Sequence, residues 1–448
     1  MVLKQLLCFH EFVTYSALNV LGMMGLSCYI LADTFFVALG LGADGLAALN
    51  LAIPIYSFIH GAGLMFGMGG AIQYSILKSR GDAKGANRVY TRTLLLALGL
   101  AGLFFVLGIL WSGALATMLG ADENVFAMTR TYIQVLLLFA PMFMVNNVLL
   151  CFVRNDGAPQ LAMMAMVGGS LSNILLDYIF IFPLGMGIFG AVLATGLAPI
   201  ISMAILAPFF ARGRNRFHLA RGPLPARRAG AIVSGGVPSL IAEVSSGIVM
   251  IVFNGIILRL EGNTGVAAYG VIANLSLVVL SIFTGIAQGI QPLVSRNHGM
   301  GNGPAVQAIL RYALITTIST AIGIYGIVFF GAAPIAGIFN SERNALLHGI
   351  AVEGLRIYFI AGAFAGWNII LSAYFASMEL PRPAHIIAVL RGFLLVIPMA
   401  FLLSILGGMR GVWCAFPATE AIVAGVGWVL LRVTRTIIGG RYAPPSED

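Results

Sequence analysis

Long apolar segments separated by short polar connections form the main pattern along this chain. Twelve such segments end at connections that contain glycine, proline, asparagine or charged residues. They cover roughly residues 12–39, 46–76, 91–111, 127–152, 160–182, 186–210, 231–258, 266–292, 308–333, 355–378, 384–405 and 409–432. Since about 20 apolar helical residues cross the hydrocarbon core of a bilayer, the pattern predicts twelve transmembrane helices. The alternating polarity of a β-barrel is absent from the sequence.

The composition excludes the two main alternatives to a membrane protein. Hydrophobic residues make up 59% of the 448 residues and charged residues 9%. A soluble domain has about 45–50% and about 25% of these classes, and a disordered chain has few hydrophobic residues and many charges. The four cysteines show no spacing typical of a disulfide framework or a zinc site.

The positive charges predict the orientation of the helices. The net charge is +9, and with the N-terminus inside, 20 of the 25 Lys and Arg residues fall on the inner side. Positive residues concentrate on the cytoplasmic side of membrane proteins, so we expect a multi-pass protein of the cytoplasmic (inner) membrane with both termini in the cytoplasm. The basic stretch around 212–228 lacks the aromatics and folded module of a nucleic-acid site. It is interpreted as a linker, and no nucleic-acid partner is expected.

The two halves of the chain share landmarks in the same order. The segment 187–195 that opens the sixth span matches 411–419 at the opening of the twelfth, with glycine, two alanines and threonine at an offset of 224. Residues 45–48 match 265–268, and Gly81-Asp82 matches Gly301-Asn302, both at an offset of 220. The matches predict a duplicated six-helix unit, an organisation found in secondary transporters.

The predicted fold is therefore an all-α integral membrane protein with twelve helices in two six-helix lobes. Both units begin inside, so a pseudo-two-fold axis along the membrane normal is expected to relate them. The expected parts are an N-terminal lobe at 1–210, a basic cytoplasmic linker at 211–230, a C-terminal lobe at 231–432 and a cytoplasmic tail at 433–448.

Four acidic residues lie deep in predicted spans, namely Asp33, Asp177, Glu243 and Glu420. A carboxylate inside the bilayer is costly, so each is a candidate functional residue. Asp33 and Asp177 both lie about 9 Å below the outer boundary, at 1.5 Å per residue. Asn173 is one turn deeper on the face of Asp177, and Thr195 reaches a similar depth.

These four side chains predict an oxygen-rich cluster in the outer half of the first lobe. Oxygen ligands suit hard cations such as sodium. Two neighbouring carboxylates also hold a proton readily, because both do not ionise easily together. The residues alone therefore leave proton and sodium coupling open. At the repeat offset, Asn173 and Asp177 fall near Val396 and Ala400, while Thr195 matches Thr419.

Several motifs together resemble the multidrug and toxic compound extrusion (MATE) family, in its bacterial drug-efflux branch. They are Asp33-Thr34 and the segments 154–159, 172–178 and 187–191. The resemblance covers nearly the whole chain. It implies two six-helix lobes, cation-driven export of amphipathic or cationic organic compounds, and an ion site at Asp33, Asn173, Asp177 and Thr195. Glu243 could match an acid that some members use in the second lobe, whereas Ala365 stands near another such position.

Methionine is concentrated in the first 210 residues, which hold 14 of the 19. Flexible, polarisable side chains suit a surface that adapts to varied ligands, and we expect a substrate chamber in the first lobe. The candidate residues are Met23, Met24, Met65, Met68, Met142, Met144, Asn146, Asn147 and Met166. Secondary candidates are Glu243, Glu420 and His60, a lone histidine that could lie on a proton path or simply pack.

The expected function is antiport of small organic molecules against protons or sodium ions by alternating access. The alternatives are a flippase of lipid-linked precursors from the same superfamily and a channel. No nucleophile, base and orienting acid recur at a catalytic spacing, so an enzyme is not expected. No cofactor is expected besides the transported proton or sodium ion. The expected partners are the organic substrates and membrane lipid, and the protein is expected to be a monomer.

Overall fold

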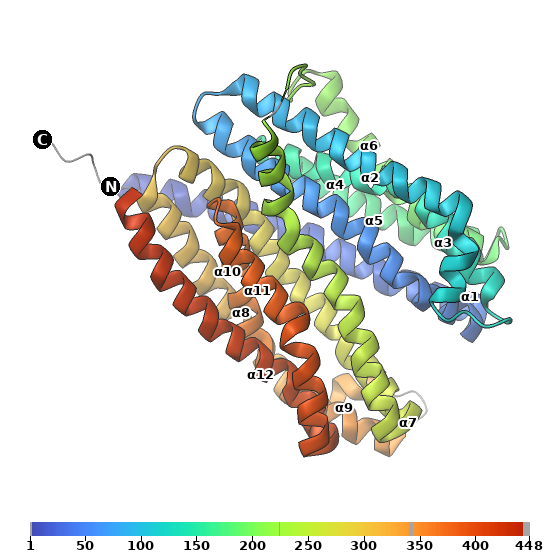
Figure 1. Ribbon diagram of the computed structural model, residues 1–448. Coiled ribbons are helices and arrows are strands. Elements are labelled where there is room, and N and C mark those ends of the chain that lie inside the picture. The colour runs from blue at the N-terminus through green and yellow to red at the C-terminus, as the bar shows by residue number, and fades with distance from the viewer. Residues whose placement is uncertain (1, 224, 340–343, 442–448) are drawn as a thin grey trace, which may run out of the picture. The chain divides into compact units, whose positions relative to one another are not determined.

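The computed structural model describes residues 2–223, 225–339 and 344–441, where every regular element is a helix. The first half contains α1 (Val2–Ser79), α2 (Ala83–Met118), α3 (Phe126–Leu138), α4 (Ala140–Asn155), α5 (Pro159–Ile181) and α6 (Gly187–Ala211), coloured blue to green in Figure 1. The second half contains α7 (Ala226–Gly299), α8 (Gly303–Ile338), α9 (Ala345–Tyr358), η1 (Phe359–Ala361), α10 (Gly362–Ser377), α11 (Pro381–Val389), η2 (Leu390–Leu394) and α12 (Val396–Arg441). η1 is a 3-10 helix and η2 is a π-helix.

Three helices are too long to be single membrane spans, and each is divided at one glycine. α1 has 78 residues, α7 has 74 and α12 has 46. The dividing residues are Gly42 (φ 69°, ψ −157°), Gly262 (φ 61°, ψ −155°) and Gly408 (φ 55°, ψ −134°). Glycine adopts this left-handed φ without the steric cost that other residues incur. Each of these helices therefore supplies two spans that meet at a sharp glycine turn.

One further span is assembled from two shorter helices. α3 and α4 meet at Phe139 with a bend of 47°, beside Pro141 in the first turn of α4. Proline lacks the N–H that would continue the helical hydrogen bonds, which explains the break. Eight helical stretches are long and apolar enough to cross a membrane, and the bent pair makes nine. Dividing the three long stretches at their glycines gives twelve spans within the described residues.

The internal repeat is visible in matching local structures. Gly42 and Gly262 lie 220 residues apart and have nearly the same non-helical backbone angles. Gly81 and Gly301 both have positive φ, and the next residues, Asp82 and Asn302, both cap the following helix. Each cap accepts a hydrogen bond from the backbone N–H three residues later, at 2.7 and 3.3 Å. The two halves thus use the same turns at corresponding positions.

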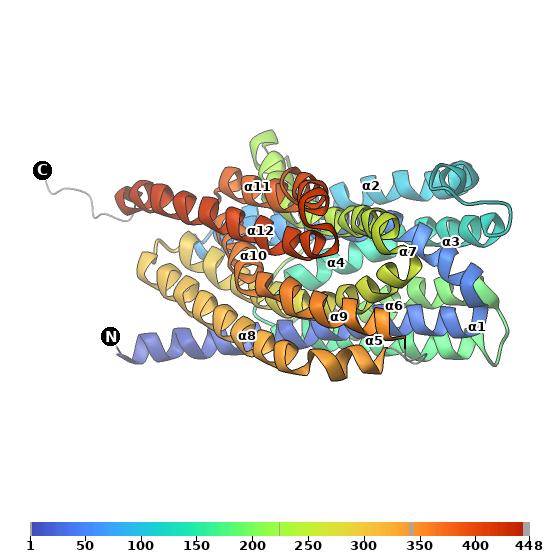
Figure 2. The ribbon, with the colours of Figure 1, turned by 90° about the horizontal axis from the view of Figure 1, so that it is seen from below.

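The helices form two compact units, one made of Leu21–Gly247 and the other of the described parts of Met1–Val20 and Ile248–Asp448. The predicted division placed the boundary in the linker at 211–230. The two units instead divide α1 after Val20 and α7 after Gly247, so each of these helices contributes to both units. In the first unit α5 lies along α6, and α3 contacts both α2 and α6 (Figure 2). In the second, α8 contacts α9 and α10. α12 extends to Arg441 through part of the predicted tail, and residues 442–448 lie outside the described residues.

The basic linker is held against the start of α2 and the end of α4. Its backbone N–H groups at 216, 218 and 220 donate to the side chains of Asp156, Asn87 and Thr91 over 2.8 to 3.0 Å. Phe217 is only 1% exposed. Its ring contacts four aromatic rings with centroids 4.7 to 6.0 Å away, those of Tyr74, Tyr90, Phe152 and Phe210. Residues 216–220 of the linker are therefore packed into the first unit.

Candidate functional site

Two buried carboxylates lie close together in the first unit. Asp33 on α1 is 7% exposed, and Asp177 on α5 is fully buried. The charge of Asp33 acts on Asp177, so the two side chains lie within electrostatic range. Oδ1 of each residue is buried and has no hydrogen-bond partner. Buried polar atoms are nearly always hydrogen-bonded, so this pair offers two acceptor oxygens that a cation or a proton would satisfy.

Asn173 and Thr195 complete the cluster, as their depths along the helices predict. When the Asn173 amide oxygen accepts from the backbone N–H of Thr195 at 3.1 Å, its nitrogen donates to Asp177 Oδ2 at 3.1 Å. Asn173 is fully buried and Thr195 is 3% exposed. The amide thus joins α5 to α6 and fixes one oxygen of Asp177. The structure brings the four predicted residues together within the first unit.

Tyr132 on α3 is a further member of this cluster that the sequence reasoning did not identify. Its hydroxyl hydrogen-bonds with the Thr195 side chain, and the charges of Asp33 and Asp177 both act on it. Tyr132 is 5% exposed. A tyrosine beside polar Gln134 in an apolar span was the only signal in the sequence. Phenol oxygens can accept or donate, so Tyr132 adds a group that adapts to either state of the carboxylates.

The whole chain is similar to solved structures and to curated proteins. A crystal structure of a MATE protein in complex with MaL6 superposes with a TM-score of 0.91 at 24% identity, covering 96% of this chain and 97% of that one. An outward-facing multidrug resistance MATE family transporter of the MOP superfamily has a TM-score of 0.89 at 25% identity and covers 96% of both chains. The multidrug export protein MepA of Staphylococcus saprophyticus is 24% identical over 429 residues, or 95% of this chain and 94% of that protein.

The family model described as MatE matches residues 20–179 and 238–402, which together are well over half of the chain. The chain belongs to the MatE family. The predicted family and the all-α membrane fold with twelve helices in two lobes are thereby confirmed. The protein is a multi-pass membrane transporter.

In this MatE chain the predicted substrate residues lie in different environments. Met23, Met65, Met68 and Met144 are buried, Met24 and Met166 are partly buried, and Met142 is 38% exposed. The sulfur of Met166 would be 3.0 Å from a Cβ added at Gly22, so it packs directly against α1. Several of these side chains therefore fill the core of the first unit, and their role in binding substrate stays a prediction.

Of the two predicted asparagines, Asn147 has a defined contact. It is 8% exposed, and its Nδ2 lies 3.5 Å from the backbone oxygen of His60. The same nitrogen would be 2.8 Å from a Cβ at Gly63, so glycine makes room for the amide there. Asn146 keeps a buried Oδ1 without a hydrogen-bond partner.

Glu420 lies in the second unit in a buried ion pair. Its Oε1 accepts from Arg391 Nε at 3.1 Å and Nη2 at 2.8 Å, and its Oε2 accepts from Asn368 Nδ2 at 2.7 Å. Glu420 is 1% exposed, and its contacts join α10, η2 and α12. Arg391 belongs to η2, within the helical stretch formed by α11, η2 and α12. An arginine in that span is tolerated because Glu420 neutralises it.

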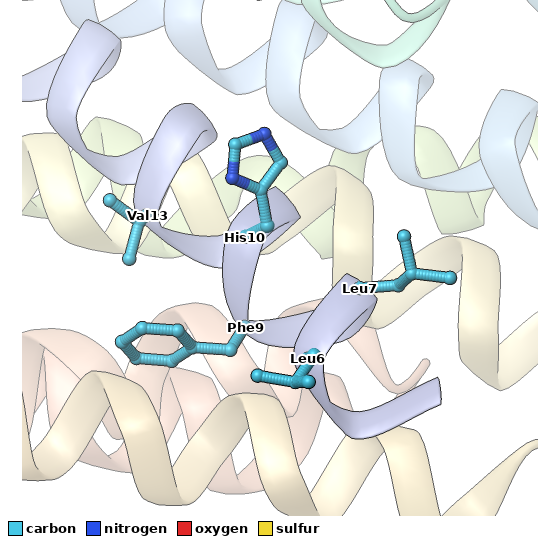
Figure 3. Close-up of a pocket in the computed structure, with 5 residues that line it drawn as sticks. All are labelled: Leu6, Leu7, Phe9, His10 and Val13. Atoms are coloured by element: carbon cyan, nitrogen blue, oxygen red, sulfur yellow. The ribbon is translucent and has the colours of Figure 1, made fainter. Parts of the chain in front are cut away.

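A hollow of about 450 Å³ lies along the first turns of α1 (Figure 3). Five residues of α1 line it, namely Leu6, Leu7, Phe9, His10 and Val13. All five come from one helix and four are apolar, so the hollow has the character of a lipid-facing surface. Among the described residues, no three His, Cys, Asp or Glu side chains gather in a way that could hold a metal ion.

Proposed function

We propose that this chain is a cation-coupled antiporter that exports amphipathic and cationic organic compounds across the cytoplasmic membrane. The observation that carries the proposal is the pair of unpartnered carboxylate oxygens on Asp33 and Asp177 inside the first unit. Because no protein group donates to these two oxygens, a proton or cation from solution is favoured as their partner. The name of the MepA relatives, multidrug export protein, supports the substrate class.

Coupling requires that the ion bind one conformation better than another. In the proposed cycle a proton or sodium ion reaches Asp33 and Asp177 from outside and satisfies their free oxygens. Because Asp33 lies on α1 and Asp177 on α5, the ion changes how α1 packs against α5. That movement reshapes the methionine-rich chamber and releases the organic compound outward. The chain acts as a monomer with both termini in the cytoplasm.

The experiment is transport of a fluorescent organic cation into proteoliposomes under an imposed proton or sodium gradient. Asp33→Asn removes one carboxylate and keeps its shape, whereas Asp44→Asn is the matched control because Asp44 is exposed near the outer turn of α1. A coupling free energy of about 1–3 kcal/mol corresponds to roughly 5–150-fold, and D33N should lose a stimulation of that size. Gradient-driven transport by D33N at the level of D44N would contradict the proposal.

A further inference from the structure

A line of hydrogen-bonding side chains leads away from Asp33 along the first unit. Tyr29 lies one helical turn before Asp33 on α1, on the same face. Its hydroxyl is 2.5 Å from the hydroxyl of Tyr56, on the second span of α1. The charge of Asp33 acts on both hydroxyls. The Asp33 carboxylate therefore lies within electrostatic range of two hydrogen-bonded phenols in an apolar core.

Glu243 on α7 lies at the other end of this path. Its Cβ would be 3.0 Å from a Cβ added at Gly61, so the glycine lets Glu243 lie directly against α1. One turn later on α7, a Cβ added at Gly247 would lie 3.7 Å from the Oγ of Ser57 on α1. The second span of α1 and the first part of α7 thus pack closely against each other in antiparallel directions. The charge of Glu243 also acts on the Tyr56 hydroxyl.

The path runs inward from the ion cluster. At 1.5 Å per residue from the turn at Gly42, Asp33 lies about 14 Å deep, and Tyr29 and Tyr56 about 20 Å deep. Glu243 lies 19 residues before the corresponding turn at Gly262, or about 28 Å deep. Glu243 is partly exposed, whereas Asp33 is buried. A proton that travelled along these groups would move from the buried cluster toward a more accessible carboxylate nearer the cytoplasm.

His60 lies beside the path. Its ring stacks on the Tyr56 ring with centroids 5.6 Å apart and an interplanar angle of 7°. The side chain is 7% exposed, and its Nδ1 has no hydrogen-bond partner. Phe143 packs edge-on against the same tyrosine at 5.8 Å. His60 and Phe143 hold the Tyr56 ring in the orientation that directs its hydroxyl at Tyr29, so His60 is a positioning residue.

We propose that Tyr29 and Tyr56 form a proton relay from Asp33 to Glu243, which makes the proton the coupling ion of this antiporter. The inference rests on the proposed antiport function. The carboxyl of Asp33 gives its proton to the Tyr29 oxygen, Tyr29 passes its own proton to Tyr56, and Tyr56 passes one to the Glu243 carboxylate. Asp33 ends one proton poorer and Glu243 one proton richer, with no change in electron count.

Sodium cannot follow this route, because a chain of hydroxyl groups transfers protons by exchanging O–H bonds and offers no ion a coordination shell. The titratable groups that face the relay are Asp33, Tyr29 and His60 from α1, Tyr132 from α3 and Glu243 from α7. The uncharged Asn147 of α4 contacts the backbone of His60. The path therefore ends on a carboxylate at each side, as donor and acceptor of one proton.

Tyr56→Phe tests the relay because it removes one hydroxyl and keeps the ring that stacks on His60. Tyr90→Phe is the matched control, since Tyr90 is a buried tyrosine that contacts Phe152 and Phe217 at the inner end of the unit. Proton-driven transport of ethidium into proteoliposomes should fall by about 100-fold or more in Y56F, the lower end of what one proton-transfer group contributes. Y90F should transport like the wild type, and both variants should bind ethidium with unchanged affinity.

Glu243→Gln supplies a second variant, which should show the same loss of proton-driven transport with retained ethidium binding. Wild-type rates in both Y56F and E243Q would overturn the relay while leaving antiport intact. Transport by the wild type that follows a sodium gradient and ignores a proton gradient would also overturn it. The absence of any response to either gradient in the wild type would instead refute the proposed function, so the two failures are distinguishable.

Discussion

The buried ion pair of Glu420 and Arg391 allows a quantitative test of the second unit. Glu420→Gln removes the negative charge but keeps the size of the side chain. The carboxylate accepts three hydrogen bonds of 2.7 to 3.1 Å, two of them from the guanidinium. Glutamine presents an NH₂ group to one of these donors and leaves the arginine charge uncompensated inside a span. The side chains are 1% and 16% exposed, so water can do little to replace the lost partner.

Removing one member of such a buried pair costs about 3–5 kcal/mol, whereas replacing both with apolar groups costs much less. We therefore expect E420Q and Arg391→Met each to lower the unfolding temperature in detergent clearly, and the E420Q/R391M double variant to recover part of the loss. Intrinsic tryptophan fluorescence can follow the melt, because Trp413 is fully buried in the core of the same unit.

Glu353→Gln is the control, because Glu353 pairs with Arg410, whose side chain is 78% exposed. Such surface pairs contribute about 0–1 kcal/mol, so E353Q should melt close to the wild type. The reasoning is refuted if E420Q melts like E353Q, or if the double variant is less stable than the sum of the single losses predicts.

Two further predictions concern packing in the first unit. A Cβ at Gly69 would lie 1.8 Å from the backbone oxygen of Ile232, so Gly69→Ala should destabilise the protein by about 1–3 kcal/mol or more. Gly102→Ala, where nothing lies within 4 Å, should leave the unfolding temperature unchanged, and equal unfolding temperatures for the two variants would contradict the close helix contact. Phe217→Ala should cost about 3–5 kcal/mol and expose the linker to trypsin, whereas Leu219→Ala, at a side chain that is 70% exposed, should not; equal cleavage rates would show that the linker is not held by Phe217.

The sequence predicted the spans well because their apolar length is set by the thickness of the bilayer. It could not predict that α1, α7 and α12 continue through their turns, since glycine in a connection indicates a break without specifying its angles. The bend between α3 and α4 had a visible signal in Pro141. The sharing of α1 and α7 between the two units depends on tertiary contacts that no local pattern encodes.

The candidate site was predictable to the extent that helix geometry determines depth. Asp33, Asn173, Asp177 and Thr195 meet because they lie at comparable distances from the neighbouring helix ends at Gly42, Ile181 and Gly187. Tyr132 was missed because α3 begins at an irregular connection, so its depth could not be counted. The pairing of Arg391 with Glu420 was not predicted, because the two residues lie 29 residues apart in the sequence. Charge pairing between helices is invisible when each span is read separately.

Proton release on substrate binding tests the central claim most directly, namely that Asp33 and Asp177 hold the coupling ion. Ion and substrate binding are reciprocally linked, so adding ethidium to the purified protein in weakly buffered detergent should release protons. The account predicts release from the wild type and from D44N, and none from the double variant D33N/D177N at saturating ethidium. Equal release from the wild type and D33N/D177N would contradict it.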